Sequence, residues 1–331
     1  MLIKGTRSNW RVPYIVHGFL MLIIPKCVFR LSYKRIMREY KQLDDSEREY
    51  VDGRASYYCN LPYGSSLPAD APSLQDHTYF NKIGGSVYFF DTYEYTRYFP
   101  QTLRWLQQPG DVFYKLPSPM ISKSRLIPEK GQCCNEVIIN QDKIRHFIFI
   151  SDPFKWEEKK CMILFRGACH GKPMREHFLS NFINHPLFDI RDTAHDSTNP
   201  PEWRQDKEMS IYSHLRYRYI MSLEGADVAS NLKWVMSSNS VAVMPRPTCE
   251  TWYMEGKLIP DYHYIEVADD FHDIIDKVLY YDSHPEKVKE IVKHAHEWVA
   301  QFKNKHREDM IALLTLRRYF CQTGQMTYNN V

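Results

Sequence analysis

The stretch 219–245, YIMSLEGADVASNLKWVMSSNSVAVMP, carries the pattern that decides the fold. A short apolar run, 219–223, stops at Glu224-Gly225, and a second apolar run occupies 241–244. The residues between them, from 228 to 238, have the composition of a helix. Strand, glycine turn, helix and strand form a βαβ unit, whose crossover in a parallel sheet is right-handed. We therefore predict an α/β fold built on a parallel sheet.

The helix predicted at 228–238 bears on function because of where it starts. Asp227 precedes it and is expected to cap its first turn. The free N–H groups and the positive end of the helix dipole would then face the space beyond the strand ends. Such a place suits a phosphate group, so this turn is the first candidate for a ligand site.

Further strands are predicted where short apolar runs end on polar residues, at 86–90, 146–150, 162–165 and 263–267. The polar residues that follow predicted strands are Asp91, Asp152, Arg166-Gly167, Glu224-Gly225 and Pro245-Arg246. In open parallel sheets, ligands bind at the carboxyl ends of the strands. Arg166 with Gly167 is the strongest of these, because glycine lets the backbone approach a ligand and arginine can hold a diphosphate through two hydrogen bonds.

The remaining elements are predicted to be helices and a loop. Helical spacing covers 33–55, with 44–46 expected to break that helix or to cap a second one, and then 271–279 and 288–302. Ser283 with Glu286 is expected to form a capping box before the last of these helices. Residues 60–78, rich in proline, glycine and serine, are predicted to be a loop.

The length and composition describe a globular chain with more than one domain. At 331 residues the chain exceeds one ordinary core, and 44% of its residues are hydrophobic. The net charge of +3 gives no reason to expect nucleic acid as a partner. Aromatic residues make up 14%, a share that fills large cores by default and also suits flat ligands such as sugars or bases. The charged segment KWEEKK, at 155–160, is the predicted domain boundary.

Residues 1–40 concentrate positive charge, with eight Lys and Arg against a single acid, Glu39. Within them the apolar run 12–24 is too short to span a bilayer as a helix, which needs about 20 residues. No small-residue cleavage site follows it, which argues against a signal peptide. Two interpretations remain. The segment lies on an anionic membrane surface, or it docks on the protein with a solvated basic face.

Several motifs are absent from the sequence. There is no P-loop, no G-x-G-x-x-G and no H-E-x-x-H. No D-x-D occurs, although two close aspartates would be the natural holders of a divalent ion on a diphosphate. The eight cysteines include no C-x-x-C, and a reduced compartment is the simpler interpretation. We expect no metal site and no cofactor, with Arg, Lys and a helix terminus neutralising any diphosphate.

The second half of the chain resembles glycosyltransferase family 90. The resemblance is carried by FRG at 165–167, by SLEGADVASNLKWVMSSNSV at 222–241 and by ETWYMEGKLIPDYHYIEV at 250–267. The segments IPKCVFR (24–30) and RASYYCNLP (54–62) resemble the bacterial, LpsA-type lipopolysaccharide branch of this family, which is related to the Rumi-type protein O-glucosyltransferases.

The resemblance implies a GT-B arrangement of two Rossmann-like domains facing a cleft. A C-terminal helix, in about 303–331, would return to the first domain (41–155), and 156–302 would form the domain that binds the UDP-sugar. It also implies transfer from a UDP-sugar with inversion and without a metal.

The resemblance further implies which residues bind the donor. Arg166 matches the arginine that holds the diphosphate, and Asn231 stands where eukaryotic members have a second arginine, so Lys233 or Lys123 would have to compensate. The other implied UDP-sugar-binding residues are Ser122, Gly167, Glu224, Gly225, Asp227, Val228, Ala229, Ser230 and Glu250.

An inverting transfer needs one general base to take the proton of the acceptor hydroxyl. The family uses an aspartate at a strand end of the first domain, and Asp91 after SVYFF is the matching residue. Glu94 is its nearest substitute and Asp227 a third choice. A structural Asp91, capping a helix or placed in a turn, is the alternative.

These features together predict an inverting UDP-sugar transferase that acts on a hydroxyl of a lipopolysaccharide core or another glycan. Residues 1–40 would hold it at an anionic membrane surface, peripherally on the cytosolic face of the inner membrane. The alternative is a non-catalytic, membrane-associated protein of the same fold that binds a glycan or a nucleotide sugar.

Overall fold

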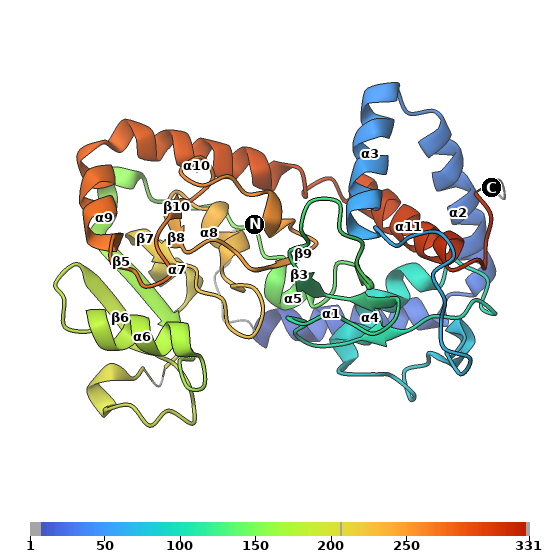
Figure 1. The fold of residues 1–331 in the computed structure, drawn as a ribbon, viewed down its shortest axis with the longest axis horizontal. Helices are drawn as coiled ribbons and strands as arrows, with labels where there is room; N and C mark the ends of the chain where they lie inside the picture. The colour runs from blue at the N-terminus through green and yellow to red at the C-terminus, as the bar shows by residue number, and fades with distance from the viewer. Residues whose placement is uncertain (1–7, 206, 329–331) are drawn as a thin grey trace. The chain divides into compact units, whose positions relative to one another are not determined.

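The computed structural model describes residues 8–205 and 207–328, which belong to two compact units (Figure 1). Unit 1 comprises Arg145–Thr248, apart from residue 206, and Met254–Gln301. Unit 2 comprises Ser8–Ile144, Cys249–Tyr253 and the residues from Phe302 to the end of the described chain. The two units are defined by contacts within the chain and do not test the domain boundaries expected from the sequence. Those boundaries, at 40, 155 and 302, remain predictions.

Unit 1 is built on a five-stranded sheet in which every pair of neighbouring strands is parallel. Its strands, in spatial order, are β10 (Ile265–Glu266), β8 (Val241–Met244), β7 (Tyr217–Met221), β5 (Lys160–Gly167) and β6 (Phe188–Asp192). Numbered along the chain, this order is 2-1-3-4-5, a doubly wound arrangement with its switch point between β5 and β7. The strands predicted at 162–165, 219–223, 241–244 and 263–267 are thus confirmed, as is the parallel sheet.

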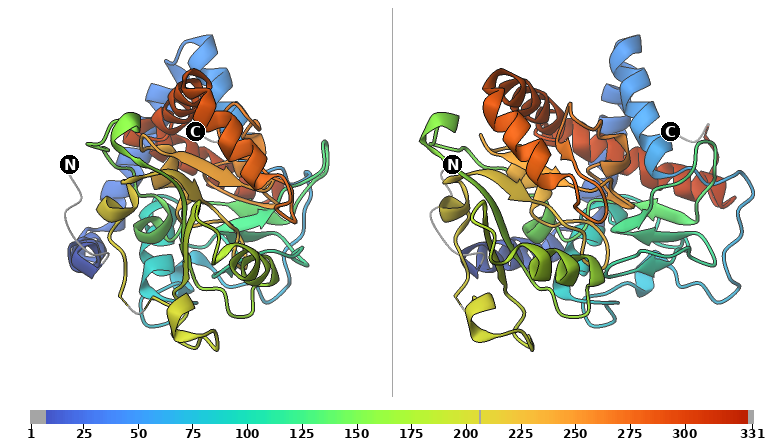
Figure 2. Two further views of the ribbon diagram at one scale, coloured as in Figure 1. Left: turned by 90° about the vertical axis from the view of Figure 1, so that its left-hand side faces the viewer. Right: turned by 60° about the vertical axis from the view of Figure 1, so that its left-hand side comes forward.

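The sheet of unit 1 is covered by helices, and this explains why its strands are continuously apolar. All four residues of β8 are buried, as expected for a parallel strand covered on both faces. The helices are α6 (Pro173–Phe182), α7 (Ile211–His214), α8 (Leu232–Met236), α9 (Ile274–Ser283) and α10 (Pro285–Ala300). Figures 1 and 2 show α10 running along the sheet on the side of α8, which it contacts.

The capping box predicted for α10 is wrong. Ser283 is the last residue of α9, and its hydroxyl donates to the Tyr280 carbonyl oxygen. His284 occupies the N-cap position of α10 and makes no side-chain capping bond, because Pro285 starts the helix one residue later than the pattern suggested.

Unit 2 is mostly helical and also contains two small sheets. Its helices are α1 (Ser8–Ile23), α2 (Lys26–Lys41), α3 (Asp45–Tyr58), α4 (Ser86–Thr96) and α11 (Lys305–Gln322), while α5 (Lys143–His146) lies at the boundary with unit 1. The strands β1 (Gln107–Gln108), β2 (Met120–Ser122) and β4 (Glu136–Ile138) form a parallel sheet, and β3 (Ser124–Leu126) pairs antiparallel with β9 (Cys249–Thr251).

The C-terminal helix α11 packs with the N-terminal part of the chain. It contacts α2, α3 and α4, and most of its side chains are buried. The break predicted at 44–46 is confirmed, since Asp44 caps α3 by accepting from the Glu47 N–H at 2.9 Å.

Two predicted strands are wrong, one in unit 2 and one in unit 1. Residues 86–90 belong to helix α4, and residues 147–150 follow α5 in irregular structure. Aromatic residues favour strands in general, but Phe89, Phe90 and Tyr93 lie on one face of α4 and pack against α1, so tertiary packing overrides the local preference. Asp91 therefore lies in the middle of a helix and not at a strand end.

Candidate functional site

The carboxyl ends of β5 and β7 form the switch point of the unit 1 sheet, where ligands of doubly wound folds bind. The chain leaves β7 through Ser222 and reaches Gly225 three residues later. A Cβ atom on Gly225 would lie 3.2 Å from Arg175 Nη2 and 3.6 Å from Lys172 Cε. The glycine therefore lets two basic side chains of the turn and helix after β5 approach the end of β7.

Arg175, on the first turn of α6, is hydrogen-bonded to backbone carbonyl groups. Its guanidinium donates to the carbonyl oxygens of Glu224 (2.9 Å), Ala168 (3.0 Å) and Leu223 (2.7 Å). Within residues 8–205 and 207–328 it makes no salt bridge to a carboxylate. Burial lowers the pKa of Arg175, as expected for a cation removed from water. The charge at the switch point is thus available to an anionic ligand.

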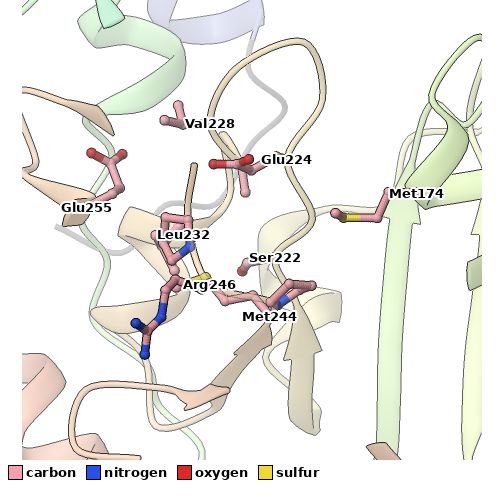
Figure 3. Close-up of a pocket in the computed structure, with 11 residues that line it drawn as sticks. Met174, Ser222, Glu224, Val228, Leu232, Met244, Arg246 and Glu255 are labelled. Carbon is pink, nitrogen blue, oxygen red and sulfur yellow. The ribbon is translucent and has the colours of Figure 1, made fainter. Parts of the chain in front are cut away.

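A small, partly open pocket lies beside these groups, at the ends of β7 and β8 (Figure 3). Figure 3 shows Ser222 and Glu224 on the segment after β7, with Met174 facing them from α6. The other lining residues are Val228, Ala229, Leu232, Met244, Pro245, Arg246, Pro247 and Glu255. Apolar walls with a few polar groups are typical of small-molecule sites.

Ser222 contributes an unsatisfied polar group to this pocket wall. Its side chain is buried, and its Oγ has no hydrogen-bond partner among the described residues. Leaving a buried hydroxyl unpaired costs about 1–3 kcal/mol. A bound ligand or an ordered water that pairs with this oxygen would remove that cost.

The Glu224 side chain holds the loop at the pocket in place through a partner within unit 1. Its carboxylate accepts from the Thr248 N–H at 3.0 Å and from the Thr248 hydroxyl at 2.6 Å. This pair ties the turn after β7 to the segment after β8.

The helix predicted at 228–238 is shorter than expected, which changes the phosphate argument. Helix α8 covers only Leu232–Met236, and Asn231 occupies its N-cap position without a side-chain capping bond. The prediction that Asp227 caps this helix is therefore wrong. A five-residue helix aligns few peptide dipoles, so the positive partial charge at the start of α8 is small. This helix therefore adds little attraction for a phosphate group.

The residues 225–231 form a turn that packs on the sheet. Val228 and Ala229 are buried in the pocket wall, and Ser230 is half-buried beside them. Asn231 donates to the Met221 carbonyl oxygen at 2.9 Å, which anchors the turn to the end of β7.

Arg166 is held away from the carboxyl edge. Its guanidinium pairs with the Asp189 carboxylate at 2.5 Å and also donates to Gln205. Asp189 lies opposite Leu164 in the parallel register, two residues before Arg166. The side chain thus points back along β6. The predicted contact between Arg166 and a diphosphate remains a prediction, and Gly167 beside it closes the end of β5.

Three further predicted ligands of the donor lie in ion pairs and are themselves buried. Lys233 pairs with Glu255 in unit 1, and Lys123 pairs with Asp111 in unit 2. Glu250, on β9 of unit 2, pairs with Arg125, and its carboxylate also accepts from Tyr57. Ser122, at the end of β2, is buried in the same unit.

Asp91 and Glu94 share Lys143 but differ in acidity. The Tyr14 hydroxyl donates to Asp91 Oδ1 at 2.8 Å, and the Lys143 N–H donates to Oδ2 at 3.1 Å. Burial raises the pKa of Asp91 to about 6, against the opposing effect of Lys143. Burial also acts on Glu94, but Lys143 and Lys305 outweigh it and lower the pKa of Glu94 to about 2.

Analysis of the sequence missed Lys172, Arg175 and Ser222. The sequence held a signal for the first two. A cation at the start of a helix is unfavourable to the helix dipole, so its presence there indicates another role, such as binding an anion. Among residues 8–205 and 207–328, no group of three or more His, Cys, Asp or Glu could hold a metal ion.

Comparison with known proteins defines the class to which this fold and site belong. The family model for glycosyl transferase family 90 matches residues 140–315, which is more than half of the chain. The chain therefore belongs to glycosyltransferase family 90. O-glucosyltransferase LpsA of Dichelobacter nodosus is 36% identical over 307 residues, which cover 93% of this chain and 94% of that protein. This similarity confirms the LpsA-type resemblance seen in the sequence.

Proposed function

We propose that this glycosyltransferase moves a sugar from a UDP-sugar to a hydroxyl of a lipopolysaccharide core or another glycan. Glucose is the first candidate for the sugar, because the similar protein is named an O-glucosyltransferase. The GT-B arrangement is part of this proposal, and the parallel sheets present in both units support it.

The observation that carries the proposal is the cationic switch point of unit 1. Arg175 and Lys172 flank Gly225 at the end of β7, next to a pocket with apolar walls and a few polar groups. A leaving diphosphate develops negative charge as its bond to the sugar breaks. Fixed cations aimed at that charge stabilise the transition state, which is the role a metal would otherwise fill. Metal independence therefore forms part of the proposal.

In the proposed reaction the acceptor oxygen attacks the anomeric carbon from the face opposite the diphosphate. The carbon–oxygen bond to the diphosphate breaks, UDP leaves, and a base takes the acceptor's proton. Asp91 is the proposed base, supported by the pKa of about 6 to which burial raises it, while Glu94, with its pKa of about 2, would be a much weaker one.

Burial sets a condition on this role of Asp91. Its side chain is 1% exposed and both of its oxygens accept hydrogen bonds, so an acceptor hydroxyl reaches it only if Tyr14 or its neighbours move. Asp91→Asn is expected to keep UDP binding and to lose transfer by about 100-fold or more. Normal turnover by that variant would remove Asp91 from the mechanism.

A panel of UDP-sugars tests the activity itself. We expect UDP to be released fastest with one donor, UDP-glucose first among them, and to be released equally in the presence of EDTA. Loss of activity with EDTA would refute metal independence. Binding of UDP with no turnover of any donor, with a glycan acceptor present, would instead favour the non-catalytic alternative.

A further inference from the structure

Among residues 12–23, helix α1 packs against the rest of unit 2 through one face. Tyr14, Ile15 and Leu22 pack against the aromatic cluster of α4. Gly18 lies on the same face, and a Cβ atom there would lie 2.6 Å from the ring of Phe90. This close approach fixes which side of α1 faces the protein.

The other face of α1 is apolar and exposed. Its residues recur at a spacing of three or four, and their exposed fractions run from 41% to 77%: Val12, Val16, Phe19, Leu20 and Ile23. Scattered exposed apolar residues are normal in proteins, but a contiguous stripe marks a binding surface.

Helix α2, which follows α1 after a bend of 98°, has an exposed face that carries positive charge. Its exposed face begins with Val28 and Leu31, which are 46% and 69% exposed. Four basic residues share that face at helical spacing: Arg30, Lys34, Arg38 and Lys41. None of these four makes a salt bridge within the part of the chain that the structure describes.

A loop next to α1 adds a further exposed aromatic residue. The Tyr79 ring contacts the Phe19 ring, with 4.9 Å between centroids. Phe80, the next residue, is 93% exposed. The apolar surface therefore extends from α1 onto this loop.

We infer that this surface binds an anionic lipid membrane. We call it the N-terminal face and define it by two sets of residues, the apolar Val12, Val16, Leu20, Ile23 and Leu31 and the basic Arg30, Lys34, Arg38 and Lys41. An apolar stripe beside basic residues is the pattern of helices that lie in the interface of an anionic bilayer. A second copy of the same face would set like charges against each other, which disfavours self-association.

The geometry favours a peripheral position. No single described helix is long and apolar enough to cross a bilayer, although Val12–Ile23 and Lys26–Lys41, bent by 98°, meet that criterion as a pair. Because one face of α1 is packed on α4, only its exposed stripe is available to lipid. The cytosolic face of the inner membrane is the proposed location, and the inference does not depend on the sugar donor.

Vesicle flotation tests the inference with the full chain. We expect binding to vesicles containing phosphatidylglycerol, little binding to pure phosphatidylcholine, and release at high salt. The variant K34Q/R38Q/K41Q is expected to lower the partition constant by about 100-fold, since each basic residue contributes about a factor of five near an anionic surface. V16S/L20S/I23S is expected to lower it by at least about tenfold.

The control is K289Q/K293Q, which removes two exposed lysines from α10 of unit 1 and should bind like the wild type. Equal binding to neutral and anionic vesicles, or equal losses in the control and K34Q/R38Q/K41Q, would overturn the inference. So would resistance to alkaline carbonate extraction, or a dimer in solution that V16S/L20S/I23S dissolves while vesicles are not bound. Unchanged thermal unfolding shows that each variant is folded.

Discussion

Arg166 and Arg175 lie on consecutive elements of unit 1 and use their charges differently. Arg166 is neutralised by Asp189, whose pKa is lowered because hydrogen bonds from Tyr217 and Arg166 outweigh the effect of burial. Arg175 is fixed by three carbonyl oxygens that carry no net charge. An anion gains more from a fixed cation without a carboxylate partner, because no existing ion pair has to break.

This contrast predicts different effects on nucleotide binding. Lys172→Gln is expected to weaken UDP binding by about fivefold to tenfold without loss of stability, because Lys172 is not in a salt bridge among the described residues. Arg175→Lys should weaken it by at least about tenfold, since the compact lysine ammonium lacks the planar guanidinium fork that spans the three carbonyl oxygens. Calorimetry with UDP measures both, and Lys293→Gln is the control.

Arg166→Ala tests whether Arg166, or instead Lys172 and Arg175, contacts the diphosphate. If Arg166 contacts the diphosphate, its loss lowers UDP affinity more than Lys172→Gln does. Unchanged affinity for Arg166→Ala, with lowered affinity for the other two variants, would assign the diphosphate contact to the turn and helix after β5.

The lowered pKa of Glu94 predicts how the stability of unit 2 depends on pH. Its folded-state pKa of about 2 lies below the usual 4.5, so it stabilises the fold above about pH 4.5, and this contribution is lost as pH falls towards 2. The size is at most about 3 kcal/mol. Glu94→Gln should therefore unfold more readily at pH 7 and show a flatter acid-unfolding curve, with Glu297→Gln as an exposed control. Parallel curves for wild type and Glu94→Gln would contradict this.

At the scale of elements, α1 and α3 each contain a glycine in a different environment. Gly53 in α3 has no atom within 4 Å of an added Cβ, whereas Gly18 in α1 has the Phe90 ring at 2.6 Å. Alanine in a helix interior normally gains about 0.5–1 kcal/mol over glycine. Gly53→Ala should gain stability in this way, while Gly18→Ala should lose about 1–3 kcal/mol because α1 must move. Chemical unfolding measures both, and equal gains would show that α1 does not pack tightly.

Elements differ in how well the sequence predicts them, and the reason is physical. The strands β5, β7 and β8 are buried on both faces, so their apolar runs are unambiguous. Residues 86–90 are also mostly apolar, but they form part of α4. The prediction failed because a short apolar run does not distinguish a buried strand from a buried helix. The start of α8 was missed because Val228 and Ala229 are buried in a turn, where apolar residues resemble the first turn of a helix.

The candidate site was predictable in position and less so in its residues. The carboxyl edge of the sheet follows from the order of strands and turns along the chain. Which side chains face that edge depends on pairings between segments, such as Arg166 with Asp189 or Lys233 with Glu255. No local pattern encodes such pairings. Arg175 had only the weak signal of a cation in the first turn of a helix, and its three carbonyl partners are visible only in the structure.

At the scale of the whole molecule, one buried ion pair joins distant segments of unit 2. The Glu308 carboxylate on α11 pairs with Arg54 on α3 and accepts from Trp252 Nε1 at 2.6 Å. Glu308→Ala would leave a buried arginine uncompensated and should cost about 3–5 kcal/mol. Glu297→Ala, which removes an exposed pair on α10, should cost less than about 1 kcal/mol. Similar midpoints of denaturant unfolding for both variants would show that the buried pair is dispensable.

The path of the chain between the units has a consequence for synthesis on the ribosome. Unit 1 ends at Gln301, while unit 2 begins at Ser8 and still needs Cys249–Tyr253 and α11. The part translated first is therefore completed last. The apolar faces of its first helices stay uncovered until α11 has left the ribosome. Chaperone demand during translation should therefore fall mainly on the N-terminal segment.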